Sequence, residues 1–177
     1  MNLIILDRDG VINHDSDQFI KSPDELRPIP GSLEAIALLN RWGWRVVLAS
    51  NQSGVGRGLF DMDTLNAIHD KMVKSLAQVG GRLDAIFFCA HPADSTCNCR
   101  KPKPGLLIEI SERFNTDLTG VPMVGDSLRD LQAAAAVGGL PCLVLTGKGT
   151  KTREDPQLPP QTMIFDDLAA VAAQLTA

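Results

Sequence analysis

The sequence predicts an α/β fold in which a parallel sheet is sandwiched between helices. Two observations lead to this prediction. Short, continuously apolar runs are typical of strands buried on both faces, and amphipathic stretches with helical spacing lie between them. Strands and helices that alternate along a chain imply right-handed crossovers and parallel pairing. Because 177 residues suffice for one full core, we expect a single domain over residues 1–177.

Six apolar runs are expected to form the strands of this sheet. In chain order they cover residues 3–6, 45–49, 85–88, 122–124, 141–145 and 162–165. The second run, RVVLA, is rich in the β-branched residues that strands favour. The fifth, PCLVL, places Cys142 among apolar neighbours and predicts a core role for it.

Five amphipathic stretches are expected to form helices, over residues 32–41, 61–79, 104–114, 127–137 and 166–175. Apolar residues recur at helical spacing from Leu65 to Leu76, after Asp61 or Asp63 as a candidate N-cap. The third stretch opens with proline, as first turns often do. The fourth is followed by Gly138, a candidate C-cap.

Two connections between these elements stand out. The segment 147–160 is polar and proline-rich and is expected to be a surface loop. The segment 13–30 is long for a connection between a strand and a helix, which favours a functional role for it.

Composition excludes several classes of protein. The chain has 17 basic and 21 acidic residues, a net charge of −4 and no tyrosine, so neither a basic surface nor a base-stacking platform for nucleic acid is expected. The first apolar run stops at Asp7, and no stretch of about 18 apolar residues exists. We therefore expect a cytoplasmic protein with no membrane partner, whose cysteines are ligands or core residues rather than disulfides.

Carboxylates follow two of the predicted strands at the point where each ends. Asp7 and Asp9 come directly after the first strand, and Asp126 follows the fourth. Ligands of parallel sheets bind outside the carboxyl ends of the strands, and residues two apart on an extended chain point the same way. We therefore expect these carboxylates to face one reacting centre. Converging carboxylates need a cation, and oxygen-only ligands favour Mg²⁺. A phosphate is the natural substrate, because a carboxylate can attack its phosphorus.

Two further groups complete a phosphate site. Ser50, Asn51 and Gln52 follow the second strand and offer hydroxyl and amide groups, and Lys101 could bind an anionic oxygen. Four such groups in order at successive strand ends make coincidence improbable. The glycines from residue 54 to 58 follow a G-x-G-x-G pattern, which does not fit the dinucleotide-binding motif. His14 and His69 are isolated, and surface or packing roles are expected for both.

The segments DRDG, ASNQSG, RKPKPG and MVGDSLRD resemble the four motifs of the haloacid dehalogenase (HAD) superfamily of phosphatases. The resemblance implies a Rossmann-like, HAD-like fold. It makes Asp7 the nucleophile, and Asp9 first the general acid and then the general base. It also implies that Ser50 and Lys101 hold the phosphoryl oxygens. Mg²⁺ would be held by the carboxylates of Asp7 and Asp126 and by the backbone carbonyl of Asp9.

Three positions qualify this resemblance. Val11 stands where the family usually has Thr or Ser, so a hydroxyl near the general acid is missing. Ser127 replaces a lysine that some members carry after the fourth-motif aspartate. Asp130 has two interpretations that are about equally supported, as a residue that supports the metal ligands or as a solvated helix residue.

A cluster of soft ligands lies between the third strand and the lysine motif. Cys89, His91, Cys97 and Cys99 fall within eleven residues, and a Cys₃His set is typical of structural Zn²⁺. A redox pair of Cys97 and Cys99, or chance, are the alternatives. We expect a zinc loop at about residues 89–99, ordered by the metal because it has little apolar content.

The chain has no cap insertion, either here or after the first motif, so it resembles a capless member of the superfamily. The zinc loop then forms one wall of the site. Because it ends directly at Arg100 and Lys101, we expect the metal to position both side chains.

Two kinds of capless, zinc-loop phosphatase are compatible with these motifs. SNQSGVGRG resembles the kind that hydrolyses the C7 phosphate of D-glycero-D-manno-heptose 1,7-bisphosphate, a step in the synthesis of lipopolysaccharide core precursors. The short zinc loop resembles equally well the kind that acts on histidinol phosphate. On the first interpretation the reaction passes through an aspartyl-phosphate and yields heptose 1-phosphate.

The same resemblance implies the substrate contacts. The sugar would be contacted by Asp15, Ser16, Asp17 and Gln18, and the transferred phosphate by Ser50, Asn51, Gln52 and Ser53. The phosphate on the anomeric carbon should meet a basic side chain, with Arg100 the first candidate and Arg57 the second.

Three rival classes remain open at this point. A non-enzymatic phospho-acceptor also uses Asp and Mg²⁺, but it has no acid two residues beyond the acceptor, where this chain has Asp9. A zinc-dependent interaction module would not need Asp7. A polynucleotide 3′-phosphatase of the same superfamily is disfavoured by the acidic charge balance. We expect a monomer that acts on a small phosphorylated sugar.

Overall fold

The computed structural model describes residues 1–177 as a regular alternation of strands and helices. The strands are β1 (Asn2–Leu6), β2 (Trp44–Asn51), β3 (Ala85–Cys89), β4 (Pro122–Gly125), β5 (Leu140–Val144) and β6 (Met163–Phe165). The helices are α1 (Ser32–Arg41), α2 (Ser53–Gly56), α3 (Met62–Gln78), α4 (Gly105–Phe114), α5 (Leu128–Ala136), α6 (Gly149–Arg153) and α7 (Leu168–Leu175), with a 3₁₀ turn η1 (Pro23–Glu25). All six predicted strands and all five predicted helices are confirmed.

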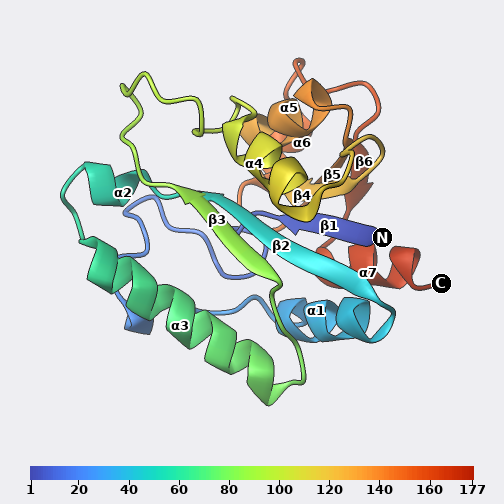
Figure 1. Ribbon diagram of the computed structural model, residues 1–177, viewed down its shortest axis with the longest axis horizontal. Coiled ribbons are helices and arrows are strands. Elements are labelled where there is room, and N and C mark those ends of the chain that lie inside the picture. The colour runs from blue at the N-terminus through green and yellow to red at the C-terminus, as the bar shows by residue number, and fades with distance from the viewer.

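The six strands form one parallel sheet in the order β3-β2-β1-β4-β5-β6. After β1 the chain places β2 and β3 on one side, and it then crosses back to place β4 on the other side of β1 (Figure 1). In such sheets a crevice opens at the carboxyl ends of the two strands where the order reverses. Here that crevice lies between the ends of β1 and β4.

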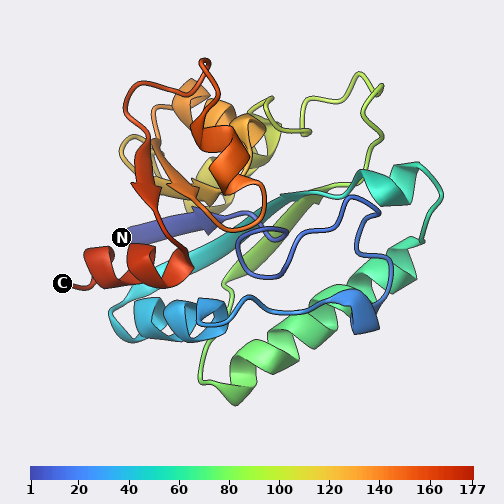
Figure 2. The same cartoon turned by 180° about the vertical axis from the view of Figure 1, so that it is seen from behind.

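Helices cover both faces of the sheet, and each face has its own apolar core. Helices α1, α3 and α7 pack on one face, while α4 and α5 pack on the other (Figures 1 and 2). The alternation of β1 explains this division, because Ile4 and Leu6 join the first core and Leu3 and Ile5 the second. The strand is therefore apolar throughout, as its sequence predicted.

Three short elements were not predicted, and one of them corrects the expectation for residues 147–160. Part of that segment forms helix α6, which packs back on the fold because the Thr152 hydroxyl donates to the backbone oxygen of Asp126 at 2.7 Å. The other two are η1 and the four-residue helix α2. Of the two candidate N-caps of α3, the structure selects Asp61, whose carboxylate accepts from the backbone N–H of Thr64, whereas Asp63 lies within the helix. None of the helices combines the length and the apolar character that a membrane span requires.

Candidate active site

Three carboxylates converge at the crevice between β1 and β4. One oxygen of each of Asp7, Asp126 and Asp130 lies within 4.8 Å of the others, and all three side chains are buried. Asp7 follows β1, Asp126 follows β4, and Asp130 lies in the first turn of α5. The structure therefore decides between the two interpretations of Asp130, because a solvated helix residue would not lie in this cluster.

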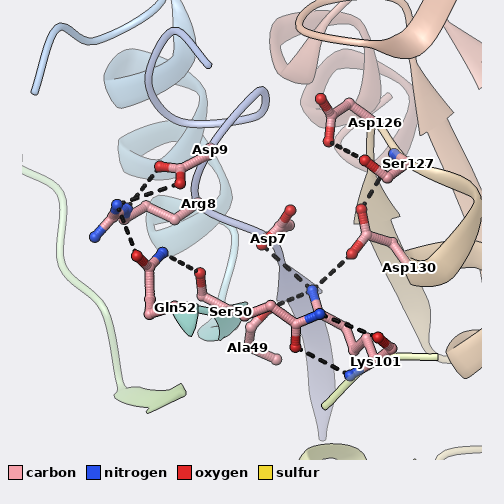
Figure 3. Close-up of polar contacts among 11 residues, drawn as sticks. Asp7, Arg8, Asp9, Ala49, Ser50, Gln52, Lys101, Asp126, Ser127 and Asp130 are labelled. Carbon is pink, nitrogen blue, oxygen red and sulfur yellow. Dashed lines mark hydrogen bonds and ion pairs between the residues drawn. The ribbon is translucent and has the colours of Figure 1, made fainter. Parts of the chain in front are cut away.

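One ammonium group is set among these carboxylates. The Lys101 Nζ atom lies 2.7 Å from an Asp130 oxygen and 3.3 Å from an Asp7 oxygen, and it also donates to the backbone oxygen of Ala49 at 2.7 Å (Figure 3). The two acidic partners hold the pKa of Lys101 above its ordinary value, although burial acts to lower it. Lys101 is therefore a fixed cation beneath Asp7.

The cluster carries more negative charge than Lys101 balances. Burial first, and then the charge of Asp130, raise the pKa of Asp7 to about 8. The same two causes raise the pKa of Asp126 to about 7. Carboxylates that resist ionisation in this way are typical of a site that needs a further cation, and their oxygen-only donor set fits Mg²⁺.

The backbone around Asp126 forms a close cradle for its carboxylate. The Lys148 N–H donates to one carboxylate oxygen at 2.8 Å, which fixes the orientation of the group. A Cβ atom on Gly10 or on Gly147 would overlap this carboxylate, and both glycines have positive φ angles. Glycine is required at these two positions because the chain passes too close for any other side chain.

Asp9 lies in a different environment from Asp7. Its carboxylate accepts from the Arg8 Nε atom at 2.8 Å (Figure 3). It also accepts from the Asn13 side-chain amide at 3.0 Å, and a quarter of the side chain is exposed. Burial acts to raise the pKa of Asp9, but the charge and hydrogen bonds of Arg8 outweigh it, so the pKa lies below its ordinary value. The two carboxylates of the first motif therefore favour opposite protonation states.

The second and third motifs are locked to each other. The Asn51 side chain accepts from the backbone N–H of Lys101 at 3.0 Å and donates to its backbone oxygen at 3.1 Å. Ser50 is buried, and its hydroxyl accepts from the Gln52 side chain at 2.8 Å. The two hydrogen bonds of Asn51 thus fix the position of the Lys101 backbone.

A polar cavity of about 230 Å³ lies over these groups. It brings together most of the side chains that the sequence singled out: Asp7, Asp9, Asp15, Ser16, Asp17, Asn51, Gln52, Ser53, Arg57, Arg100 and Asp126. Three others do not line it. Ser50 and Lys101 are almost fully buried below, and Gln18 is exposed outside it.

The sequence reasoning missed three lining residues, Phe19, Arg129 and Lys148, and it named Ser127 only as the replacement of a lysine. Arg129 lies within the fourth motif, in the first turn of α5, where a cation opposes the helix dipole. Lys148 follows β5, and the rule that ligands bind at the carboxyl ends of parallel strands could have identified it. Its Nζ atom lies 3.3 Å from Asp15, so it joins two loops across the cavity mouth.

Three arginines lie together at this cavity without an acidic partner. Arg57, Arg100 and Arg129 line it, and none of them takes part in an ion pair. Partial burial, and then the positive charges of Arg129 and Arg57, lower the pKa of the Arg100 guanidinium below its ordinary value. Cations that repel one another in this way form a site for an anion.

The cysteine cluster assembles beside this cavity. One ligand atom of each of Cys89, His91, Cys97 and Cys99 lies within 4.8 Å of the others. The sulfurs of Cys89 and Cys97 are 3.7 Å apart, and the His91 Nδ1 atom lies 3.3 Å and 3.2 Å from the sulfurs of Cys89 and Cys99. Two sulfurs bonded to one tetrahedral zinc ion lie about 3.8 Å apart, close to the Cys89–Cys97 separation, whereas the two separations from His91 are a few tenths of an ångström shorter than the separation of about 3.5 Å that zinc would set. The three sulfurs and one imidazole nitrogen are the donor set typical of structural zinc.

Three features define the class of this protein. They are a parallel sheet whose strand order reverses beside β1, four ordered motifs at the carboxyl ends of its strands, and a carboxylate cluster. The chain belongs to the HAD-like phosphatases, which confirms the resemblance and the fold class expected from the sequence. Residues 98–171 match the family described as HAD-hydrolase-like, and residues 3–133 match the family described as polynucleotide kinase 3 phosphatase.

Two proteins of this class are similar to this chain over nearly the whole length of both. The chain is 62% identical over 175 residues, 99% of its length and 98% of the relative's, to the D-glycero-beta-D-manno-heptose-1,7-bisphosphate 7-phosphatase of Bordetella bronchiseptica. It is 53% identical over 174 residues, 98% and 97% of the two chains, to the protein of the same name from Pseudomonas aeruginosa.

Solved structures agree with these similarities. A crystal structure of the D,D-heptose 1,7-bisphosphate phosphatase from B. bronchiseptica, complexed with magnesium and phosphate, superposes with a TM-score of 0.98 at 62% identity and covers 99% of this chain and 98% of that one. The corresponding enzyme from Burkholderia thailandensis has a TM-score of 0.81 at 52% identity and covers 100% and 99%.

Proposed function

We propose that this protein is a Mg²⁺-dependent phosphatase that hydrolyses the C7 phosphate of D-glycero-β-D-manno-heptose 1,7-bisphosphate and releases heptose 1-phosphate. The observation that carries the proposal is one cavity that joins a carboxylate cluster to three unpaired arginines. A substrate with two phosphates fits this arrangement, because one phosphate can react at the carboxylates while the other is held by the arginines. The full-length similarity to phosphatases of this name supports the choice of sugar.

Asp7 is the proposed nucleophile. Its carboxylate attacks phosphorus, the bond from phosphorus to the C7 oxygen breaks, and an aspartyl-phosphate forms. Lys101 lies beneath Asp7 and stabilises its ionised form. Bound Mg²⁺, held by Asp7, Asp126 and the backbone carbonyl of Asp9, would supply the positive charge that keeps Asp7 ionised and neutralises the phosphoryl oxygens.

Asp9 is the proposed proton carrier. A phosphate dianion bound beside it raises its proton affinity, so the protonated carboxyl can donate to the departing C7 oxygen. The resulting carboxylate then takes a proton from water, which attacks the phosphorus and regenerates Asp7. The ion pair with Arg8 favours the ionised form that this second step requires.

Arg57, Arg100 and Arg129 are the proposed ligands of the second phosphate, and Asp15, Ser16 and Asp17 the proposed contacts of the sugar hydroxyls. A structural Zn²⁺ is proposed for the cysteine cluster, where it would order the loop that leads into Arg100. A monomeric state, a cytoplasmic location and the absence of a nucleic-acid partner stay predictions from the sequence.

The test of this proposal is a side-by-side measurement of kcat/KM on three substrates with saturating Mg²⁺. These are heptose 1,7-bisphosphate, histidinol phosphate and an oligonucleotide with a 3′-phosphate. We expect a preference of at least about a hundredfold for the bisphosphate, because charged hydrogen bonds from partly buried Arg100 and Arg129 to its second phosphate contribute about 1.5 to 3 kcal/mol each. A preference for histidinol phosphate would overturn the substrate but not the mechanism. A stable aspartyl-phosphate without turnover would favour a phospho-acceptor.

A further inference from the structure

Helix α3 carries a buried histidine that the mechanism does not use. His69 is 6% exposed, so of the surface and packing roles that the sequence predicted, the structure excludes the surface role. Its ring lies 6.0 Å from that of Phe88 on the neighbouring strand β3, between centroids. Its Nε2 atom lies 3.1 Å from the Nη1 atom of Arg8, so this side chain has one specific polar partner.

The chemistry of Arg8 fixes the state of this histidine. A guanidinium has only N–H donors, so the Nε2 atom must accept and must carry no proton. The ring is then uncharged, with its proton on Nδ1. Protonation of Nε2 would place two cations against each other inside the protein. Burial, and then the charge of Arg8, lower the pKa of His69 to about 4, which agrees with an uncharged ring.

Arg8 connects His69 to the active site through hydrogen bonds. The side chain is fully buried, and its other hydrogen bonds go to Asp9 and Gln52, which both line the cavity. It donates to both oxygens of Asp9, at 2.8 Å and 3.3 Å, and to the Gln52 side-chain oxygen at 3.2 Å (Figure 3). Gln52 in turn donates to the Ser50 hydroxyl at 2.8 Å.

A buried guanidinium needs an acceptor on every side to keep one position, because an unsatisfied buried N–H is costly. Asp9 and Gln52 occupy one side of Arg8, and His69 occupies the other. Without an acceptor at residue 69, Arg8 would turn to find another partner and would take Asp9 with it. The position of the proton carrier therefore depends on a residue outside the four motifs.

We propose that His69 is a positioning residue, whose uncharged imidazole holds Arg8 and through it sets the place of Asp9. This inference rests on the proposed function, in which Asp9 moves the proton. It differs from a packing role because a residue that merely fills space needs no acceptor atom at this position.

The test compares His69→Phe, which removes the acceptor, with His69→Gln, which keeps an acceptor atom near the place of Nε2. Each variant is assayed on the sugar bisphosphate and on p-nitrophenyl phosphate, whose leaving group departs as a stabilised phenolate and needs no proton. For the bisphosphate we expect His69→Phe to lower kcat/KM about tenfold or more, since residues that hold reacting groups in place have effects of this size. For p-nitrophenyl phosphate the loss should stay below about threefold, because no general acid is needed.

The conservative variant and a control complete the test. We expect His69→Gln to recover kcat/KM on the bisphosphate to within about threefold of the wild type, because the amide oxygen restores the acceptor. Met72→Ala changes a buried residue of the same helix that packs in the apolar core. It should lower Tm and change kcat/KM for both substrates by the same factor.

Several results would overturn the inference. Equal losses on both substrates for His69→Phe would indicate a structural role only, and so would a failure of His69→Gln to recover. A ¹⁵N NMR spectrum that shows a protonated Nε2 at neutral pH would also contradict it, whatever the activity. If instead the wild type fails to hydrolyse the bisphosphate, the proposed function fails, and the NMR result still tests the contact with Arg8.

Discussion

The carboxylate cluster and the cysteine cluster are both candidate metal sites, but the chain builds them in opposite ways. Asp7 is distant in the sequence from Asp126 and Asp130, and the three meet because β1 and β4 are neighbours in the sheet. The cysteine cluster comes from one stretch of eleven residues, and beyond Cys89 it contains no helix or strand. The first site is assembled by the fold, whereas the second is assembled by local spacing.

This difference teaches what each metal has to do. The carboxylates are held by the sheet and by backbone contacts such as that of Lys148 with Asp126, so their arrangement does not depend on a bound ion. The cysteine loop contains few apolar residues, so we expect the proposed zinc ion to supply its order. Loss of Mg²⁺ should therefore remove activity and leave the fold intact, whereas loss of Zn²⁺ should disorder one wall of the site.

The largest expected effect comes from a substitution in the carboxylate cluster, the site that the fold assembles. Asp7→Asn should lower kcat on the bisphosphate at least about a thousandfold, because an amide cannot attack phosphorus. The Tm should not fall, since the amide replaces a buried carboxyl group of the same shape whose charge the site disfavours. Steady-state kinetics and thermal unfolding check both results. Activity of Asp7→Asn above a few per cent of wild type would contradict the role of Asp7.

The next largest effect is expected from substitutions in the cysteine cluster, the site that local spacing assembles. The double variant Cys97→Ser, Cys99→Ser should lose zinc and lower kcat/KM about ten- to a hundredfold with saturating Mg²⁺, because Arg100 and Lys101 lose their support. Zinc content, far-UV circular dichroism and limited proteolysis should show a fold that is intact outside the loop. Cys142→Ala is the matched control and should keep its zinc, because Cys142 lies in the core. Full activity of a zinc-free, folded protein would contradict the prediction.

A smaller effect tests the cavity that both clusters border. Arg129→Gln should raise KM for the bisphosphate about tenfold, because a charged hydrogen bond to phosphate contributes about 1.5 to 3 kcal/mol. The KM for a sugar with only the C7 phosphate should stay unchanged. Arg41→Gln, an exposed arginine at the end of α1, is the control. An equal rise in KM for both substrates would mean that Arg129 does not select the second phosphate.

The smallest expected effect on activity is that of His69→Gln, at the residue that contacts Arg8. This variant should change mainly the pH dependence of stability. Because the pKa of His69 falls from 6.5 to about 4 on folding, the unfolded chain binds a proton between these pH values that the folded chain does not. His69 therefore leaves the free energy of unfolding unchanged above pH 6.5, and it lowers the free energy of unfolding progressively as the pH falls from 6.5 towards 4. His69→Gln should therefore lose less stability over this window, by on the order of 3 kcal/mol. Urea unfolding at several pH values measures the difference, and His14→Gln, at an exposed histidine, should behave as wild type.

The comparison of the two clusters also explains which site residues the sequence could predict. The cysteine ligands were predictable as a set because their spacing alone brings them together. Asp7 and Asp126 were predictable because strand ends meet at one edge of a parallel sheet. The burial of Ser50 and the place of Arg129 in the cavity wall were not predictable. Ser50 was expected to follow the second strand, but β2 extends to Asn51 and includes it, and Arg129 lies in the first turn of α5, so each depends on how neighbouring elements pack.

The sequence by itself determined the order of strands and helices, the four motifs and both candidate metal sites. Hydrophobic periodicity predicts the strands, the carboxyl ends of parallel strands meet at one edge of the sheet, and short-range spacing brings the cysteine ligands together. Only the tertiary structure decided that Asp130 pairs with Lys101, that Arg8 binds Asp9 at the cavity, and that His69 contacts Arg8. These contacts join residues far apart in the chain, and their geometry depends on the packing of whole elements. A periodic pattern identifies the face of a helix that is buried, but it does not identify which buried polar groups will meet there.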